Sequence, residues 1–257
     1  MKILAIGDVV GPSGCEFVRK KLPAFKAERG IGLCIINGEN SAQGNGILPS
    51  SAEHLLASGA DVITTGNHAF KRWESADYFS LHEYVLRPAN YPDAVAGNGY
   101  YIYDSGKERV CVISLLGTVY MENLENPFVT ADRIINRVKD DCSHIIIDFH
   151  AEATGEKAAL AHYLDGRVTA VLGTHTHVQT ADETILPKGT AFMTDIGMTG
   201  PMHSALGVDP ECVIKRFLLH TPVRFNFSKN PCELHGALIE TDDRTKKCVG
   251  IERIKLV

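Results

Sequence analysis

The sequence lacks the features that mark several classes of protein. It has no basic surplus, since 31 acidic residues outnumber 26 lysines and arginines and the formal net charge is −5. A protein that coats nucleic acid needs a basic face to displace the counterions of the phosphates, so that role is excluded. A phosphate-containing substrate is not excluded, because bound metal ions can reverse the charge of a site locally.

Leader segments, membrane spans and paired cysteine motifs are missing as well. The opening letters MKILAIGD run directly into a strand pattern, and no apolar run approaches the roughly 20 residues of a membrane helix. None of the seven cysteines forms a C-x-x-C motif, so neither a zinc knuckle nor a thioredoxin-type site is indicated. We therefore expect a cytoplasmic protein with reduced thiols and no membrane partner.

No linker, repeat or low-complexity tract divides the chain, and we expect a single domain over residues 1–257. Short apolar runs alternate with helical patterns, which favours an α/β fold. The runs are continuously apolar, as in strands buried on both faces. The expected strands are 2–7, 33–37, 61–65, 109–117, 144–149, 169–174 and 190–195, and the expected helices are 16–29, 51–58, 127–139 and 155–164.

The last part of the chain has a different pattern. Residues 222–228, 234–243 and 247–257 alternate between apolar and polar side chains. This pattern predicts consecutive antiparallel strands that complete a second sheet.

Polar residues follow five of the apolar strands directly, and ligands of α/β sheets bind beyond the carboxyl ends of the strands. Each cluster alone has an ordinary explanation as a helix cap, a turn or a buried histidine. Their repetition at five strand ends indicates a shared site. The clusters are residues 7–8, 37–40, 66–68, 148–150 and 173–177.

These clusters supply oxygen and imidazole ligands without a thiolate, a set that suits Mn, Fe or Zn at a catalytic pair. His175 and His177 would point the same way from an extended strand end, and Glu39 is best placed to bridge two metals. Two metals about 3.5–4 Å apart would activate a bridging hydroxide for in-line attack on phosphorus, and His68 could protonate the leaving oxygen. The candidate ligands are Asp8, Glu39, Asn40, Asn67, His150, His175 and His177.

The order of the clusters resembles the calcineurin-like metallophosphoesterases. That pattern runs as an aspartate after the first strand, an acidic cluster after the second, G-N-H after the third, a lone histidine and then G-H-x-H. Here the D-x-H motif of the wider family is D-V-V, with Val10 in place of the histidine. The usual G-D-x-x-D is replaced by N-G-E-N, and G-H-x-H is loosened to G-T-H-T-H.

With these departures, the chain resembles the bacterial YmdB-type cyclic-nucleotide phosphodiesterases from residue 3 to about residue 207. The segments that carry the resemblance are IGDVVG, INGENSAQGNGI, TTGNHAF, LRPANYP, DFHAEATGEK, GTHTHVQTAD and TDIGMTGP. It implies an α/β/β/α sandwich, a homo-oligomer and hydrolysis of 2',3'- and 3',5'-cyclic nucleotides at a two-metal centre. It further implies that Asp8, Glu39, Asn40 and His177 hold one metal, that Glu39, Asn67, His150 and His175 hold the other, and that His68 donates the proton.

The valine at position 10 bears on the identity of the metal. Without a histidine there, the first metal draws on Asn40 or water, and this oxygen-rich set favours Fe or Mn over Zn.

Two further loops are candidates for substrate contact. Arg87 and Asn90 lie in a loop that contains two prolines, where a plain surface connection is an equal alternative. Met198, Thr199 and His203 lie in a glycine-containing segment after a strand, which could approach a ligand closely.

The leading functional prediction is a two-metal phosphodiesterase for small cyclic nucleotides, with RNA ends as a further substrate class. A phosphomonoesterase or nucleotidase on the same site is one alternative, although a dianion would need more cationic groups than the motif strands supply. A metal-dependent nucleotide sensor without turnover is the other. A sensor would be expected to have a damaged catalytic set, yet every proposed ligand and His68 are present.

Overall fold

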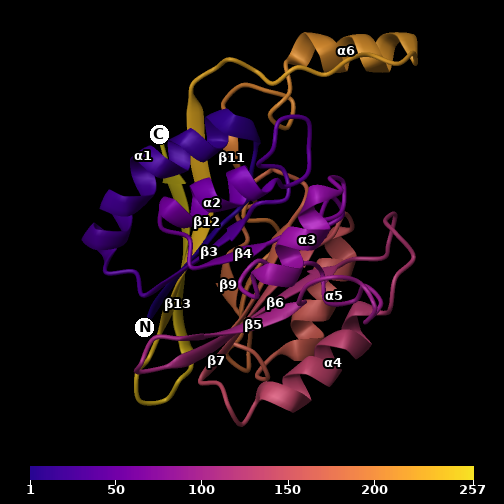
Figure 1. Ribbon diagram of the computed structural model, residues 1–257. Helices are drawn as coiled ribbons and strands as arrows, with labels where there is room; N and C mark the ends of the chain where they lie inside the picture. Colours follow the sequence, from indigo (N-terminus) through magenta and orange to yellow (C-terminus); the bar gives the residue numbers. More distant parts are fainter.

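The computed structural model describes residues 1–257 and consists of two sheets packed face to face, with helices on the two outer faces. In Figure 1, helices α1 and α2 lie on one side of the strands, and α4 and α5 lie on the other. This confirms the predicted α/β fold and its four-layer α/β/β/α arrangement.

The first sheet combines strands from both ends of the sequence. Its order is β2-β11-β12-β1-β3-β4, and β13 pairs with β12. Strands β1, β3 and β4 are parallel, whereas β12 runs antiparallel to β1. The bounds are β1 Lys2–Ile6, β2 Asp8–Val9, β3 Leu33–Asn37, β4 Val62–Thr64, β11 Met198–Pro201, β12 Cys232–Thr241 and β13 Cys248–Leu256.

The second sheet is built entirely from the middle of the chain. Its order is β5-β6-β7-β8-β10-β9, and β6, β7, β8 and β10 are parallel. The parallel strands of each sheet therefore have their carboxyl ends at one edge. The bounds are β5 Tyr100–Asp104, β6 Arg109–Leu116, β7 His144–His150, β8 Ala170–Thr174, β9 Thr184–Ile185 and β10 Ala191–Met193.

Helices α1, α2 and α3 pack on the first sheet, and α4 and α5 pack on the second. Helix α6 has no buried residue and stands apart from both sheets in Figure 1. No helix combines the length and the apolar composition that crossing a bilayer requires. The bounds are α1 Gly11–Arg29, α2 Pro49–Ala57, α3 Glu74–Leu81, α4 Pro127–Val138, α5 Thr154–Leu164 and α6 Pro210–Leu219.

Strand β1 shows why the apolar runs are continuous. Ile3 and Ala5 face the second sheet, in a core that both sheets share. Leu4 and Ile6 face the opposite way, into the core under the helices. Because neighbouring side chains on a strand point to opposite faces, a strand in an inner layer needs apolar residues at every position. Full burial of each large aliphatic side chain contributes about 1.5–3 kcal/mol.

The C-terminal part departs from the prediction in two ways. Residues 222–228 do not form a regular strand, and only an isolated bridge joins Phe227 to Val208. The alternating apolar residues of this segment have no sheet face to cover, and Phe225 remains 51% exposed. Strands β12 and β13 do not complete a second sheet, because β12 pairs with β1 and extends the sheet in which the chain begins.

Candidate metal centre

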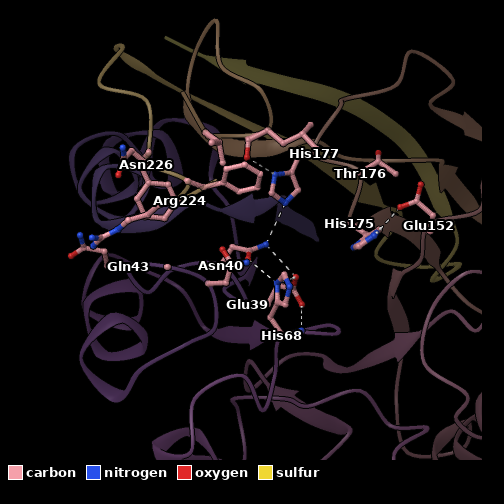
Figure 2. A pocket seen from close by; sticks show the side chains of 16 residues that line it. Glu39, Asn40, Gln43, His68, Glu152, His175, Thr176, His177, Arg224 and Asn226 are labelled. Carbon is pink, nitrogen blue, oxygen red and sulfur yellow. Dashed lines mark hydrogen bonds and ion pairs between the residues drawn. The ribbon is translucent and has the colours of Figure 1, made fainter. Parts of the chain in front are cut away.

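The structure brings all seven predicted ligands together at the carboxyl ends of strands from both sheets. Glu39, Asn40, His175 and His177 line a cavity of about 650 Å³, together with His68 (Figure 2). The other three ligands do not line the cavity: Asp8 contacts Asn40, His150 contacts Glu39, and Asn67 contacts His150.

Three potential ligand atoms converge on one nitrogen of His150. Its Nε2 lies 3.2 Å from Oε1 of Glu39, 3.0 Å from Oδ1 of Asn67 and 3.1 Å from Nδ1 of His175. A single N–H cannot make a good hydrogen bond to all three atoms at once, and a cation among them would satisfy every one of these donors. One ligand atom from each of Glu39, His150 and His175 lies within 4.8 Å of the others, a spacing that fits a metal ion.

A second group lies beside the first and shares Glu39 with it. Nε2 of His177 is 3.5 Å from Oδ1 of Asp8. Nδ2 of Asn40 lies 3.4 Å from Asp8, 3.2 Å from Glu39 and 3.3 Å from His177. The Asn40 amide donates to the carboxylates in this arrangement, and it would need a half-turn to offer its oxygen to a cation. With that rotation, the group has the oxygen and imidazole donors of a divalent-metal site.

The charges of the two buried carboxylates suit a cation. Burial alone would raise the pKa of Glu39, but His150 and His68 together outweigh it and hold that pKa well below its ordinary value. Burial also acts to raise the pKa of Asp8, and His177 lowers it on balance. Both side chains are fully buried. Buried charges in proteins are paired or coordinate metals, so this pair of carboxylates fits a divalent-metal site.

Hydrogen bonds from behind orient the two histidines of the first group. Nδ1 of His150 is 3.0 Å from Oγ1 of Thr174, whose hydroxyl donates to Asp148 at 2.6 Å. Nε2 of His175 is 2.9 Å from Oε2 of Glu152. Each contact occupies one ring nitrogen and leaves the other facing the ligand cluster, the usual arrangement behind metal-binding imidazoles.

The backbone after β8 differs from the extended strand end that was predicted. The strand stops at Thr174, and His175 and His177 have φ values of 97° and 63°, in the left-handed region. The prediction of an extended backbone is therefore wrong, although both imidazoles still reach the ligand cluster. One imidazole contacts His150 and the other contacts Asp8, so this short segment serves both groups.

A buried ion pair holds that turn. Oδ2 of Asp195 accepts hydrogen bonds from the backbone nitrogen of Thr176 at 3.0 Å and from its hydroxyl at 2.7 Å. The same oxygen is 2.9 Å from Nζ of Lys157, and both charged side chains are fully buried. Left-handed backbone at a residue other than glycine costs about 1–3 kcal/mol and persists only where the surroundings impose it. Asp195 supplies that constraint between the two histidines.

Gly66 allows His150 to sit close to the backbone that follows β4. A Cβ atom at position 66 would lie 2.1 Å from Cδ2 of the imidazole, which is shorter than any real contact. Glycine at the start of the G-N-H motif is therefore required by packing against a candidate ligand.

His68 is placed for proton transfer at the cavity. Its Nδ1 lies 3.0 Å from Oε1 of Glu39 and 2.9 Å from Oδ1 of Asn40, and its backbone nitrogen donates to Glu39 at 3.0 Å. Nε2 has no hydrogen-bond partner in the protein, and the ring lines the cavity. This nitrogen can carry a proton to or from a bound molecule.

The five residues predicted to contact substrate do not line the cavity. Arg87 and Asn90 are buried. Nη1 of Arg87 donates to the carbonyl of Pro88, and Nδ2 of Asn90 donates to the carbonyls of Leu116 and Glu125. Met198 and Thr199 are buried in β11, and His203 is exposed outside the cavity. The prediction for these positions is corrected, because four of these side chains are buried within the protein and the fifth is exposed away from the cavity.

Other residues that the sequence did not single out face the cavity instead. Figure 2 shows Gln43, Arg224 and Asn226 across the cavity from His175 and Glu152. Two segments distant in sequence contribute these side chains, and no local pattern relates them.

Comparisons with known proteins identify relatives that match nearly the whole chain. A protein from Bacillus subtilis (strain 168), named 2',3'-cyclic-nucleotide 2'-phosphodiesterase, is 48% identical over 255 residues, covering 99% of this chain and 96% of the relative. A crystal structure from Thermus thermophilus, described as a hypothetical protein, superimposes with a TM-score of 0.94 at 38% identity and covers 100% of this chain and 99% of the other.

A second crystal structure, described as a novel phosphatase from Mycoplasma pneumoniae, gives a TM-score of 0.92 at 36% identity and covers 100% of this chain and 93% of the other. The family model described as YmdB-like protein matches residues 4–254. Nearly the whole chain is included in that match, so the protein belongs to the YmdB-like family.

Proposed function

We propose that the protein is a metal-dependent phosphodiesterase that hydrolyses cyclic nucleotides of the 2',3' type, the 3',5' type or both. The observation that carries the proposal is the convergence of two buried carboxylates and three histidines at one end of the cavity that His68 lines. The name of the Bacillus subtilis relative, 48% identical over nearly the full length, supports the same substrate class.

Two divalent ions fit the donors. Asp8, Glu39, Asn40 and His177 would hold one, and Glu39, Asn67, His150 and His175 would hold the other. Iron or manganese is the proposed identity, because the first set is rich in oxygen and has Val10 where the wider family has a histidine. When bound, the ions supply Lewis acidity that activates water and neutralises charge on phosphoryl oxygens.

His68 is the proposed proton donor to the leaving oxygen. Glu39 holds its Nδ1, which fixes the plane of the ring and leaves Nε2 toward the cavity. A positioned acid of this kind contributes about 100- to 10,000-fold to the rate, most strongly for poor leaving groups.

The test compares a bis-aryl phosphate with its mono-aryl counterpart, using protein reconstituted anaerobically with iron or manganese. We expect the diester to be preferred, because Arg224 is the single lysine or arginine side chain along the cavity and a phosphate dianion needs more positive charge. A preference for the monoester would replace the proposal with a phosphomonoesterase. Two bound metals without turnover of either compound would indicate a nucleotide sensor.

We also propose that the protein forms homo-oligomers in the cytoplasm. Helix α6 exposes Ile214, Phe217, Leu218 and Leu219, an apolar surface that association would bury. All seven cysteines are free, which fits a reducing compartment. Sedimentation of the wild type and of Phe217→Lys tests the association, and a monomeric wild type would refute it.

A further inference from the structure

The cavity has an outer wall whose residues have no role in the proposed hydrolysis of the phosphodiester. It is formed by the loop of residues 43–45 and by residues 224–227, and it lies across the cavity from the candidate metal ligand His175 (Figure 2). We refer to these two segments as the outer wall. A substrate whose phosphate lies at the ligand cluster would place the rest of its atoms against this wall.

The first segment is held in place from behind. The guanidinium of Arg72 donates to the backbone carbonyls of Gln43, Gly44 and Asn45. These bonds fix a turn in which Asn45 has a left-handed φ of 69°. The side-chain amides of Gln43 and Asn45 make no hydrogen bond within the protein, although both residues line the cavity.

The second segment is anchored by its backbone and by one ring. The backbone nitrogen of Asp209 donates to the carbonyl of Asn226 at 2.9 Å. The ring of Phe227 packs so closely on Gly11 that a Cβ there would lie 2.9 Å from it. Between these anchors and the solvent, Phe225 is 51% exposed. Arg224 is also exposed and forms no ion pair or side-chain hydrogen bond.

We propose that the outer wall binds the nucleobase of the substrate, with Phe225 stacking on the base and Arg224 and the free amides bonding its edge. The inference rests on the proposed phosphodiesterase function. It assigns a binding site to the base, the part of the substrate that the phosphodiesterase proposal does not place. An aromatic ring is a platform for a base, and guanidinium and amide groups are the side chains that pair with base edges. A wall for a second phosphate would instead need several cations, and this one has Arg224 alone.

The test separates base binding from phosphate chemistry by using two cyclic diesters. One is 2',3'-cyclic AMP, and the other is glycerol 1,2-cyclic phosphate, which has the five-membered phosphate ring without a base. For Phe225→Ala we expect KM for the nucleotide to rise about tenfold, kcat to change less than about twofold, and both constants for the glycerol compound to stay unchanged. Tyr120→Ala, which removes a 90% exposed ring outside the cavity, is the matched control and should change neither substrate.

Equal losses on both substrates would overturn the proposal, because they indicate a structural role. An unchanged KM of Phe225→Ala for the nucleotide would overturn it too, even if Arg224→Ala alone lost affinity, because the base would then not stack on the ring. If the wild type hydrolyses neither diester, the phosphodiesterase function fails. Calorimetric binding of 2',3'-cyclic AMP to the wild type and Phe225→Ala then still decides the role of the wall, since weaker binding by the variant supports it and equal binding refutes it.

Discussion

The buried ion pair between Lys157 and Asp195 makes a strong prediction. In the variant Lys157→Met, a chain of similar length fills the space, but the Asp195 carboxylate loses its partner while remaining fully buried. Removing one partner of a buried pair costs about 3–5 kcal/mol, because the remaining charge is uncompensated. For a chain of this size, that loss lowers the Tm by about 6–20 °C. Bound metal should fall as well, because Asp195 holds Thr176 between two candidate ligands.

Urea unfolding and scanning calorimetry measure the stability, and elemental analysis measures the metal. The double variant Lys157→Met/Asp195→Asn should recover part of the loss, because a neutral amide leaves no buried charge and can still accept from Thr176. Arg19→Met, which breaks an exposed pair with Glu16, is the control and should change stability little. A free energy of unfolding for Lys157→Met within about 1 kcal/mol of wild type would refute the argument.

Three further predictions concern other parts of the protein. His68→Ala should keep its metal but lose about 100- to 10,000-fold in kcat on diesters with poor leaving groups, and unchanged rates would exclude it as the acid. Gly66→Ala should displace His150 and reduce bound metal, whereas Gly155→Ala, where a Cβ meets nothing within 4 Å, should bind metal like the wild type. Burial lowers the pKa of His144 below its ordinary 6.5, so the unfolded chain takes up the proton more readily and stability falls as the pH drops through about 6.5. Urea unfolding at about pH 5.5 and 7.5 should show a smaller difference for His144→Gln than for the wild type.

The sequence predicted the parts of the site that depend on parallel strands. Apolar runs buried on both faces place the residues that follow them at one edge, which is why Glu39 and His150 meet although they are far apart in the chain. The backbone at His175 could not be predicted in the same way. Its left-handed turn depends on Asp195, whose contact with Thr176 exists only after folding.

The outer wall and the supposed substrate loops show the same limit. A cationic side chain in a loop, such as Arg87, is typical of a ligand contact, but its guanidinium donates to the carbonyl of Pro88 inside the protein. Phe225 lies in an alternating segment typical of a strand, yet it reaches the cavity because its neighbour Phe227 packs on Gly11. The burial of Arg87 and the position of Phe225 at the cavity both depend on contacts with distant parts of the chain, so local sequence patterns could not predict them.

The strand order of the two sheets has a consequence for synthesis on the ribosome. The second sheet, residues 100–193, is contiguous and can form while the chain is still growing. The first sheet cannot close until β12 has emerged, because β12 lies between β11 and β1. Until then β1 has an unpaired edge, a feature that invites association with other chains. Donors to the metal centre come from both sheets, and the strand that carries Asp8 pairs with β11, so the full donor set is held in place only after the segment that follows the second sheet has joined the first.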